Sequence, residues 1–168
     1  PAVALLDRAQ VLVDAGLVAE ADQLLAEAAE LFEASRLEHD LAQVELTRAR
    51  CALLVREPDN ALRWARAARA RFAARGNGPW LARAELAECQ ALLAGLLDAP
   101  DRAPDALAEV AAQAGALADR EGVSRLSRDA HLTAAEAFAG AGRSAEAQAA
   151  LARASQGAWR SPLPLAVR

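Results

Sequence analysis

The chain has 168 residues, of which 54% are hydrophobic and only 4% aromatic, and its formal net charge of −4 gives a pI near 5.3. This acidic balance argues against a general nucleic-acid binder, which normally presents a basic domain or stripe. The sequence has no apolar run long enough to span a bilayer and no secretory signal at its start. The composition predicts a cytoplasmic protein with no nucleic-acid or membrane partner, and its many Ala residues predict an all-α fold.

The first two predicted helices cover residues 3–14 and 17–34, and Gly16 ends the first of them. Apolar residues recur at helical spacing along both segments. The inward positions of the second helix are Ala21, Leu24, Leu25, Ala28 and Phe32. Because only a short turn separates them, the two helices should pack antiparallel.

The third predicted helix covers residues 35–56, and Ser35 and Glu38 have the spacing of a capping box at its start. Apolar residues lie on two of its faces, which is typical of a helix buried between neighbours on both sides. One face carries Leu37, Leu41, Val44, Cys51 and Val55, and the other carries Ala42, Leu46, Ala49 and Leu53. Pro58 then fits the first turn of a fourth helix, where proline is tolerated.

A fifth helix is predicted over residues 80–97, after the turn signals at 76–79. The irregular stretch 98–104 predicts an insertion before a sixth helix over 104–120, with Ala106, Val110 and Leu117 inward. Gly122 should end that helix, and Ser124 is a candidate N-cap for the seventh, which runs to residue 140. The eighth should cover residues 144–158.

Small residues near the start of every second helix recur at intervals of about 40 residues, within the range of helical repeats. These residues are Ala21, Ala61, Ala106 and Ala147. The spacing predicts four antiparallel helical hairpins over residues 2–35, 36–76, 79–121 and 123–159, together forming one repeat domain over 1–168. Residues 160–168, after Trp159, are interpreted as the start of a further repeat, and the chain as a fragment of a larger protein.

The first and last hairpins carry the same series of small and apolar residues at the same spacing. The series is Ala9, Leu12, Gly16, Ala21, Leu25 and Ala28 in the first hairpin, and Ala135, Phe138, Gly142, Ala147, Leu151 and Ala154 in the last. This series resembles the tetratricopeptide repeat (TPR) family, which implies a right-handed α-solenoid whose concave surface binds proteins. The Ala- and Arg-rich segment 60–72 also resembles the repeat region of actinobacterial proteins that carry a caspase-like CHAT peptidase domain.

Two Cys and two His residues could in principle hold zinc. Cys51, Cys89, His39 and His131 lie in different predicted helices or at their boundaries, without a CxxC or HxxxH motif. We therefore expect buried, reduced thiols, no metal site, no cofactor and no catalytic residues; any catalytic activity would lie outside this fragment. The arginines of the fourth helix are expected to pair with acidic residues of the second helix or simply to be solvated.

The TPR resemblance implies that the first helices of the hairpins line the partner-binding surface, and their exposed polar residues are the candidates for contact. These are Asp7, Gln10, Asp14, Gln43, Thr47, Arg50, Gln90 and Glu136, with Leu46, Leu53, Leu86 and Leu93 as apolar contacts. The expected function is a scaffold that binds a peptide or a partner domain. The alternatives are a regulatory segment of a CHAT-type peptidase and the effector-sensing repeats of a transcriptional regulator. The uncapped repeat ends could also form a homodimer.

Overall fold

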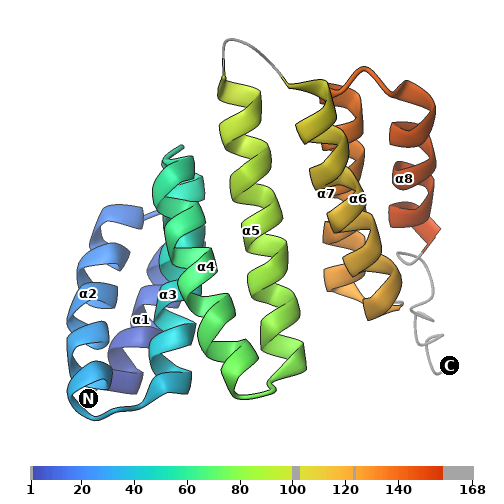
Figure 1. Cartoon of the computed structure of the whole chain (residues 1–168). Helices are drawn as coiled ribbons and strands as arrows, with labels where there is room; N and C mark the ends of the chain where they lie inside the picture. The colour runs from blue at the N-terminus through green and yellow to red at the C-terminus, as the bar shows by residue number, and fades with distance from the viewer. Residues whose placement is uncertain (1, 100–102, 123, 157–168) are drawn as a thin grey trace, which may run out of the picture. The chain divides into compact units, whose positions relative to one another are not determined.

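The computed structural model describes residues 2–99, 103–122 and 124–156, and all of the regular structure in these residues is α-helical (Figure 1). This confirms the all-α prediction. The helices are α1 (Ala2–Asp14), α2 (Val18–Ala34), α3 (Glu38–Leu54), α4 (Pro58–Ala74), α5 (Gly78–Asp98), α6 (Pro104–Glu121), α7 (Arg125–Gly140) and α8 (Ser144–Gln156). The further repeat predicted at 160–168, and Trp159 before it, lie outside the described residues.

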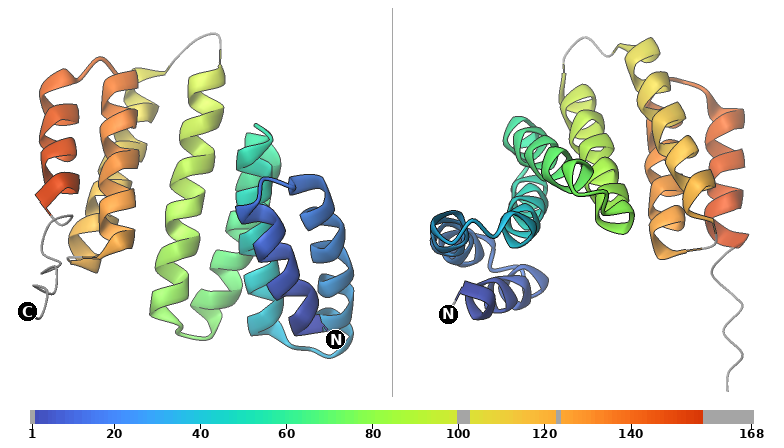
Figure 2. Two further views of the ribbon diagram at one scale, coloured as in Figure 1. Left: turned by 180° about the vertical axis from the view of Figure 1, so that it is seen from behind. Right: turned by 60° about the horizontal axis from the view of Figure 1, so that its bottom comes forward.

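The chain divides into two compact units, residues 1–100 with α1–α5 and residues 101–168 with α6–α8. The boundary falls in the predicted irregular stretch 98–104, inside the third predicted repeat. Within each unit, every helix packs against the next one along the chain. In the first unit α3 also contacts α1, and α5 contacts α3, so that α1, α3 and α5 form one layer and α2 and α4 the other. The view from behind brings α1 and α5 of this first layer to the front (Figure 2).

Five of the turns between helices share one hydrogen-bond pattern around a residue with positive φ, namely Gly16, Arg36, Arg56, Gly76 and Gly142. The amide of that residue donates to the carbonyl three residues earlier, and the next amide donates to the carbonyl five residues earlier. This is the Schellman motif, which satisfies the last carbonyls of a helix. Each of these helices therefore ends in the same way and sends the chain back antiparallel.

The capping box predicted at Ser35 and Glu38 is wrong. The amide of Ser35 donates to the carbonyl of Leu31, so Ser35 closes α2 instead of opening α3. Because Arg36 makes the left-handed turn, α3 begins only at Glu38, and Leu37 precedes it without any side-chain cap. Ser35 and Glu38 have the spacing of a helix start, but Ser35 and Arg36 belong to the Schellman turn that ends α2.

The turns of the first unit recur at a constant spacing along the sequence. Its left-handed residues lie 20 residues apart, at Gly16, Arg36, Arg56 and Gly76, and α2, α3 and α4 each contain 17 residues. Hairpins in this unit therefore repeat every 40 residues without insertion. Residues 40 apart occupy equivalent positions, as Phe32 and Phe72 do: both are fully buried on the inner face of their helices.

We expect Arg56→Gly to stabilise the protein by about 0.5–1 kcal/mol, because a left-handed conformation costs a residue with a Cβ about 1–2 kcal/mol, and the greater unfolded-state entropy of glycine offsets part of that gain. Arg56 has a φ of 60°. Urea unfolding followed by circular dichroism measures the change. The matched control is Gly16→Ala, at a φ of 80° where an added Cβ would meet open space, which should destabilise by about 1 kcal/mol. A loss of stability in Arg56→Gly would contradict the assigned backbone strain.

The two apolar faces predicted for α3 are confirmed within the helix, but Leu37 and Val55, which were assigned to the first face, lie just outside it and are 46% and 49% exposed. Leu41, Val44 and Cys51 belong to a core cluster shared with α1 and α2. On the opposite side, Ala42 and Ala49 pack against small residues and rings of α4 and α5. The helix is therefore enclosed within its layered unit, and few of its residues remain free to meet a partner.

In the second unit, Ser124 is the N-cap of α7 as predicted, because its hydroxyl accepts a hydrogen bond from the amide of Ser127 at 3.0 Å. Gly122 ends α6, also as predicted. The inward position assigned to Ala106 is wrong: Ala106 is only half-buried, and the neighbouring Leu107 is fully buried. The insertion before α6 shifts the register of that helix relative to the other repeats.

Candidate protein-binding surface

The predicted contact residues lie on four helices in two units. Asp7, Gln10 and Asp14 are on α1, Gln43, Thr47 and Arg50 on α3, Gln90 on α5, and Glu136 on α7. The residues of α1, α3 and α5 thus share one layer of the first unit. Glu136 is exposed on a helix of the second unit.

Three of these residues meet at the carboxylate of Asp14. Gln10 donates to Asp14 Oδ1 from its Nε2 at 3.2 Å, and Arg50 donates to the same oxygen from its Nη2 at 3.2 Å. The side chains of Arg50 and Asp14 remain 53% and 62% exposed. The cluster therefore links α1 to α3 while most of its hydrogen-bonding capacity stays open to solvent, and its ion pair is weak enough to exchange for a partner's groups.

The other α3 candidates are more constrained. Gln43 shares a hydrogen bond of 3.0 Å with the Nε2 of His39. The hydroxyl of Thr47 donates to the Gln43 carbonyl at 2.9 Å, and Thr47 is only 8% exposed. The imidazole of His39 also packs edge-on against the rings of Phe72 and Trp80. This arrangement positions Gln43 for contact but leaves Thr47 largely a structural residue.

The apolar contacts need correction. Leu86 and Leu93 are buried, and Leu46 and Leu53 are half-buried against clusters of the core. On α3 the exposed apolar residue is instead Leu54, at 56% exposure, one helical turn beyond Arg50. From the sequence alone, Leu54 looks like the last residue of a buried apolar stripe. Only its position in the last turn of α3 could have indicated that it is exposed.

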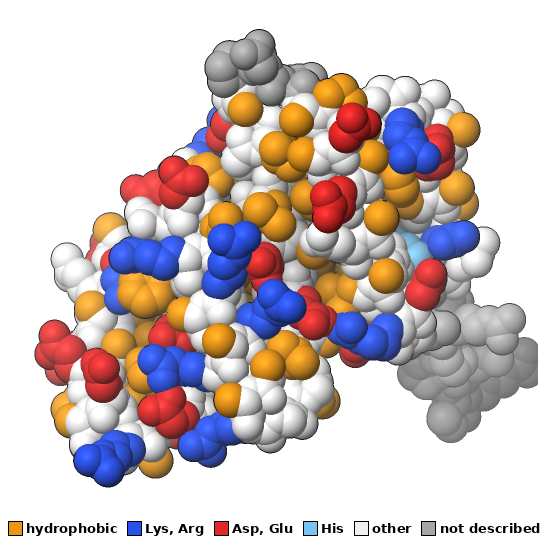
Figure 3. Space-filling model, viewed as in Figure 1, with side chains coloured by type: hydrophobic (Ala, Val, Ile, Leu, Met, Phe, Trp, Pro, Cys, Tyr) orange, Lys and Arg blue, Asp and Glu red, His pale blue; other side chains and the backbone are white. Residues whose placement is uncertain are grey.

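The Arg-rich helix α4 forms its ion pairs with α3 and α5, so the predicted pairing with α2 is wrong. Arg71 contacts Glu38 and lies 3.0 Å from Glu45 Oε1, and both partners are on α3. On the other side, Arg66 and Arg69 share the carboxylate of Glu88 on α5. The pairing follows the packing, because α3 and α5 are the helices that α4 contacts. In Figure 3 acidic and basic side chains alternate over this side of the first unit.

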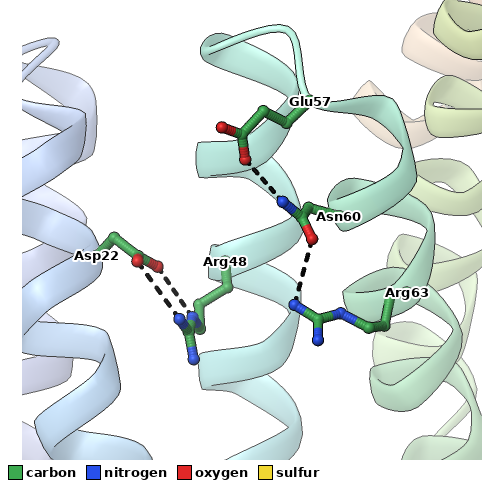
Figure 4. Close-up of polar contacts among 5 residues, drawn as sticks. All are labelled: Asp22, Arg48, Glu57, Asn60 and Arg63. Atoms are coloured by element: carbon green, nitrogen blue, oxygen red, sulfur yellow. Dashed lines mark hydrogen bonds and ion pairs between the residues drawn. The ribbon is translucent and has the colours of Figure 1, made fainter.

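The acidic partner that α2 does supply is Asp22, which receives two hydrogen bonds from Arg48 of α3, at 2.9 and 3.3 Å (Figure 4). The same guanidinium lies 4.2 Å from the centre of the Trp64 ring, and Arg63 lies 4.5 Å from it. Stacking of this kind orders arginine side chains. Asp22 and Arg48 are 26 residues apart, as are Glu45 and Arg71, and neither pair was predicted from the sequence.

Burial raises the pKa of the Cys51 and Cys89 thiols to about 11, because the charged thiolate is poorly solvated there. The expected burial of both thiols is confirmed, and a thiol with a raised pKa is a poor nucleophile at neutral pH. Burial also lowers the pKa of His131 below its usual value. Within residues 2–99, 103–122 and 124–156, no three Cys, His or acidic residues converge to hold a metal ion.

None of the helices in the described ranges combines the length and the apolar character that crossing a bilayer requires. Comparison of the chain with family models, curated proteins and solved structures found no match.

Proposed function

We propose that this protein is an interaction scaffold, a TPR-like right-handed superhelix that binds an extended peptide or a partner domain through the layer formed by α1, α3 and α5. The observation that carries the proposal is the Asp14 cluster, in which two helices place an exposed acceptor and exposed donors side by side. Leu54 lies exposed one turn further along α3. Polar groups fixed by neighbouring helices beside apolar surface are typical of protein-binding sites.

The rigid support beneath this layer favours recognition without rearrangement. Small residues hold α3 close to α4 and α5, as where Ala49 packs with Ala65 and Ala87. The order of such a surface reduces the entropic cost of binding. The free thiols of Cys51 and Cys89 favour a reducing compartment, and we place the protein in the cytoplasm.

The test is selection of binders from a random peptide library with the wild-type chain, followed by measurement of their Kd. We expect selected peptides to bind the Arg50→Glu, Gln90→Arg double variant at least about tenfold more weakly, because the first change reverses an exposed charge on α3 and the second adds a charge at the half-buried Gln90 of α5. The matched control is Arg75→Glu, which reverses the charge of an exposed residue at the end of α4 and should leave Kd unchanged. Peptides that bind all three proteins equally would place the binding surface elsewhere.

A further inference from the structure

The chain contains two asparagines, and their side chains have different surroundings. Asn60 lies in α4, where its Nδ2 donates to Glu57 Oε2 at 2.8 Å and its Oδ1 accepts from Arg63 Nη2 at 3.2 Å (Figure 4). Asn77 immediately precedes α5, and its side chain makes no hydrogen bond within the part of the chain that the structure describes. The carboxamide of Asn77 is therefore free to rotate, whereas that of Asn60 is held on both sides.

The residues that follow the two asparagines differ as well. Asn60 is followed by Ala61, which is fully buried and whose amide donates to the Glu57 carbonyl at 3.0 Å. Asn77 is followed by Gly78, whose amide donates to the carbonyl two residues earlier at 3.1 Å. Gly78 is exposed and has no side chain to shield its backbone nitrogen. The amide nitrogen after Asn77 is therefore more accessible than the one after Asn60.

We propose that the folded protein deamidates spontaneously at Asn77. The Gly78 nitrogen gives up its proton to a solvent base and attacks the Asn77 Cγ, which closes a five-membered succinimide ring. The bond from Cγ to the side-chain nitrogen breaks, and that nitrogen takes up a proton and leaves as ammonia. Water then opens the ring: cleavage at Cγ gives aspartate, and cleavage at the main-chain carbonyl carbon gives isoaspartate. The proposal is independent of the binding function proposed above.

The reaction requires local opening at the start of α5. To reach Cγ, the Gly78 nitrogen must turn to the side of the Asn77 Cβ, so the Asn77 ψ of 80° has to change. This rotation breaks two backbone hydrogen bonds: the one that the Gly78 amide donates, and the one from the Leu81 amide to the Asn77 carbonyl at 2.9 Å. Fraying at the end of a helix is among the least costly motions of a folded chain. At Asn60 the same rotation would also release two side-chain hydrogen bonds and displace the buried Ala61.

The two products have different consequences for α5. Aspartate at position 77 keeps the course of the backbone, and its carboxylate lies at a helix N-terminus, where free amides and the helix dipole stabilise negative charge. Isoaspartate instead directs the main chain through the side-chain carbon and lengthens the α4–α5 turn by one atom. Trp80 in the first turn of α5 stacks on Phe72 of α4 at 5.5 Å. Isoaspartate should therefore disturb this packing, and aspartate should not.

The test incubates the folded wild-type protein at mildly alkaline pH and follows the two asparagines by mass spectrometry in separate tryptic peptides, residues 76–83 and 57–63. We expect deamidation at least about tenfold faster in the first peptide, a ratio that corresponds to about 1.4 kcal/mol in activation free energy. An isoaspartyl methyltransferase should label part of the product.

Gly78→Ala is the variant that tests the attacking nitrogen. An added Cβ there would meet no atom within 4 Å, so the fold accommodates it. It should nevertheless slow deamidation of Asn77 at least about tenfold, because the Cβ hinders the approach of the nitrogen to Cγ. Circular dichroism confirms that the variant is folded. Equal rates at the two asparagines, or a Gly78→Ala protein that deamidates as fast as the wild type, would overturn the proposal.

Two further measurements complete the test. Deamidation of Asn77 that occurs only in denaturant would show that the folded turn protects it, and would likewise overturn the proposal. Asn77→Asp supplies the aspartate product alone and should unfold at no lower urea concentration than the wild type. Incubated protein that contains isoaspartate should unfold at a lower urea concentration than Asn77→Asp, and identical unfolding would contradict the disturbance assigned to isoaspartate.

Discussion

Phe72→Ala is expected to lower the free energy of unfolding by about 3–5 kcal/mol, as typical of a fully buried phenylalanine. Phe72 is 0% exposed and packs among Ala42, Ala68 and Ala84. These buried neighbours are alanines, which cannot extend into the space that the ring leaves, and the larger Leu46, Trp80 and Leu81 pack only at the partly exposed edge of the cluster. The loss should be measured by urea unfolding, followed through tryptophan fluorescence, because the Trp80 ring stacks on Phe72 at 5.5 Å.

Two further variants show whether the cavity is the cause. Phe72→Leu keeps most of the volume and should cost less than about 1.5 kcal/mol. Phe32→Ala removes the equivalent ring one repeat earlier, where no ring stacking is found within the described residues. It should therefore cost less than Phe72→Ala by about 0.5–1.5 kcal/mol, the worth of an aromatic pair. Equal losses in Phe72→Ala and Phe72→Leu would show that the surrounding helices collapse into the space.

Much of the fold followed from local patterns. Gly16 and Gly142 were readable as helix ends because glycine adopts a positive φ at little cost, and Pro58 marked the first turn of α4. The turns at Arg36 and Arg56 were not readable in this way, because arginine rarely adopts a positive φ. Because the turn at Arg36 was not foreseen, Ser35 was assigned to the start of α3 instead of the end of α2.

The candidate surface was less predictable than the helices. The shared layer of α1, α3 and α5 follows from the stacking of successive hairpins, which brings Arg50 of α3 within reach of Asp14 on α1, whereas Gln10 and Asp14 are one helical turn apart on the same helix. Exposure within that layer does not follow from periodicity, because it depends on which neighbouring helix covers each position. The outcome for Thr47 shows this: it has the same helical phase as Asp7, but it is buried whereas Asp7 is exposed.

Arg71→Met is expected to destabilise the protein by about 2–3 kcal/mol at neutral pH, because it leaves the Glu45 carboxylate without its cation. The Glu45 side chain is 8% exposed, and burial raises its pKa even though Arg71 acts to lower it. Removing one partner of a buried pair typically costs about 3–5 kcal/mol, and the 32% exposure of Arg71 reduces that figure here. Arg75→Met, at an exposed arginine of the same helix, is the control and should change stability by less than about 0.5 kcal/mol.

The pH dependence separates a lost charge pair from lost packing. Without Arg71 the pKa of Glu45 should rise further in the folded state, so the native protein binds a proton more tightly than the unfolded chain does. The stability defect should therefore shrink as pH falls from 7 towards the ordinary glutamate value of 4.5, because protonation removes the buried charge. A defect that stays constant over this range would assign the loss to the arginine stem.

The double variant Arg71→Met, Glu45→Leu distinguishes the pair itself from the charge left behind. It replaces the pair with apolar side chains of similar size, and such exchanges are often neutral or stabilising. We expect it to recover most of the stability lost in Arg71→Met and to show no pH dependence from this site. Glu38 would remain, but its side chain is 44% exposed and stays solvated without Arg71. If the double variant is no more stable than Arg71→Met, the pair itself, and not the uncompensated charge, holds α3 against α4.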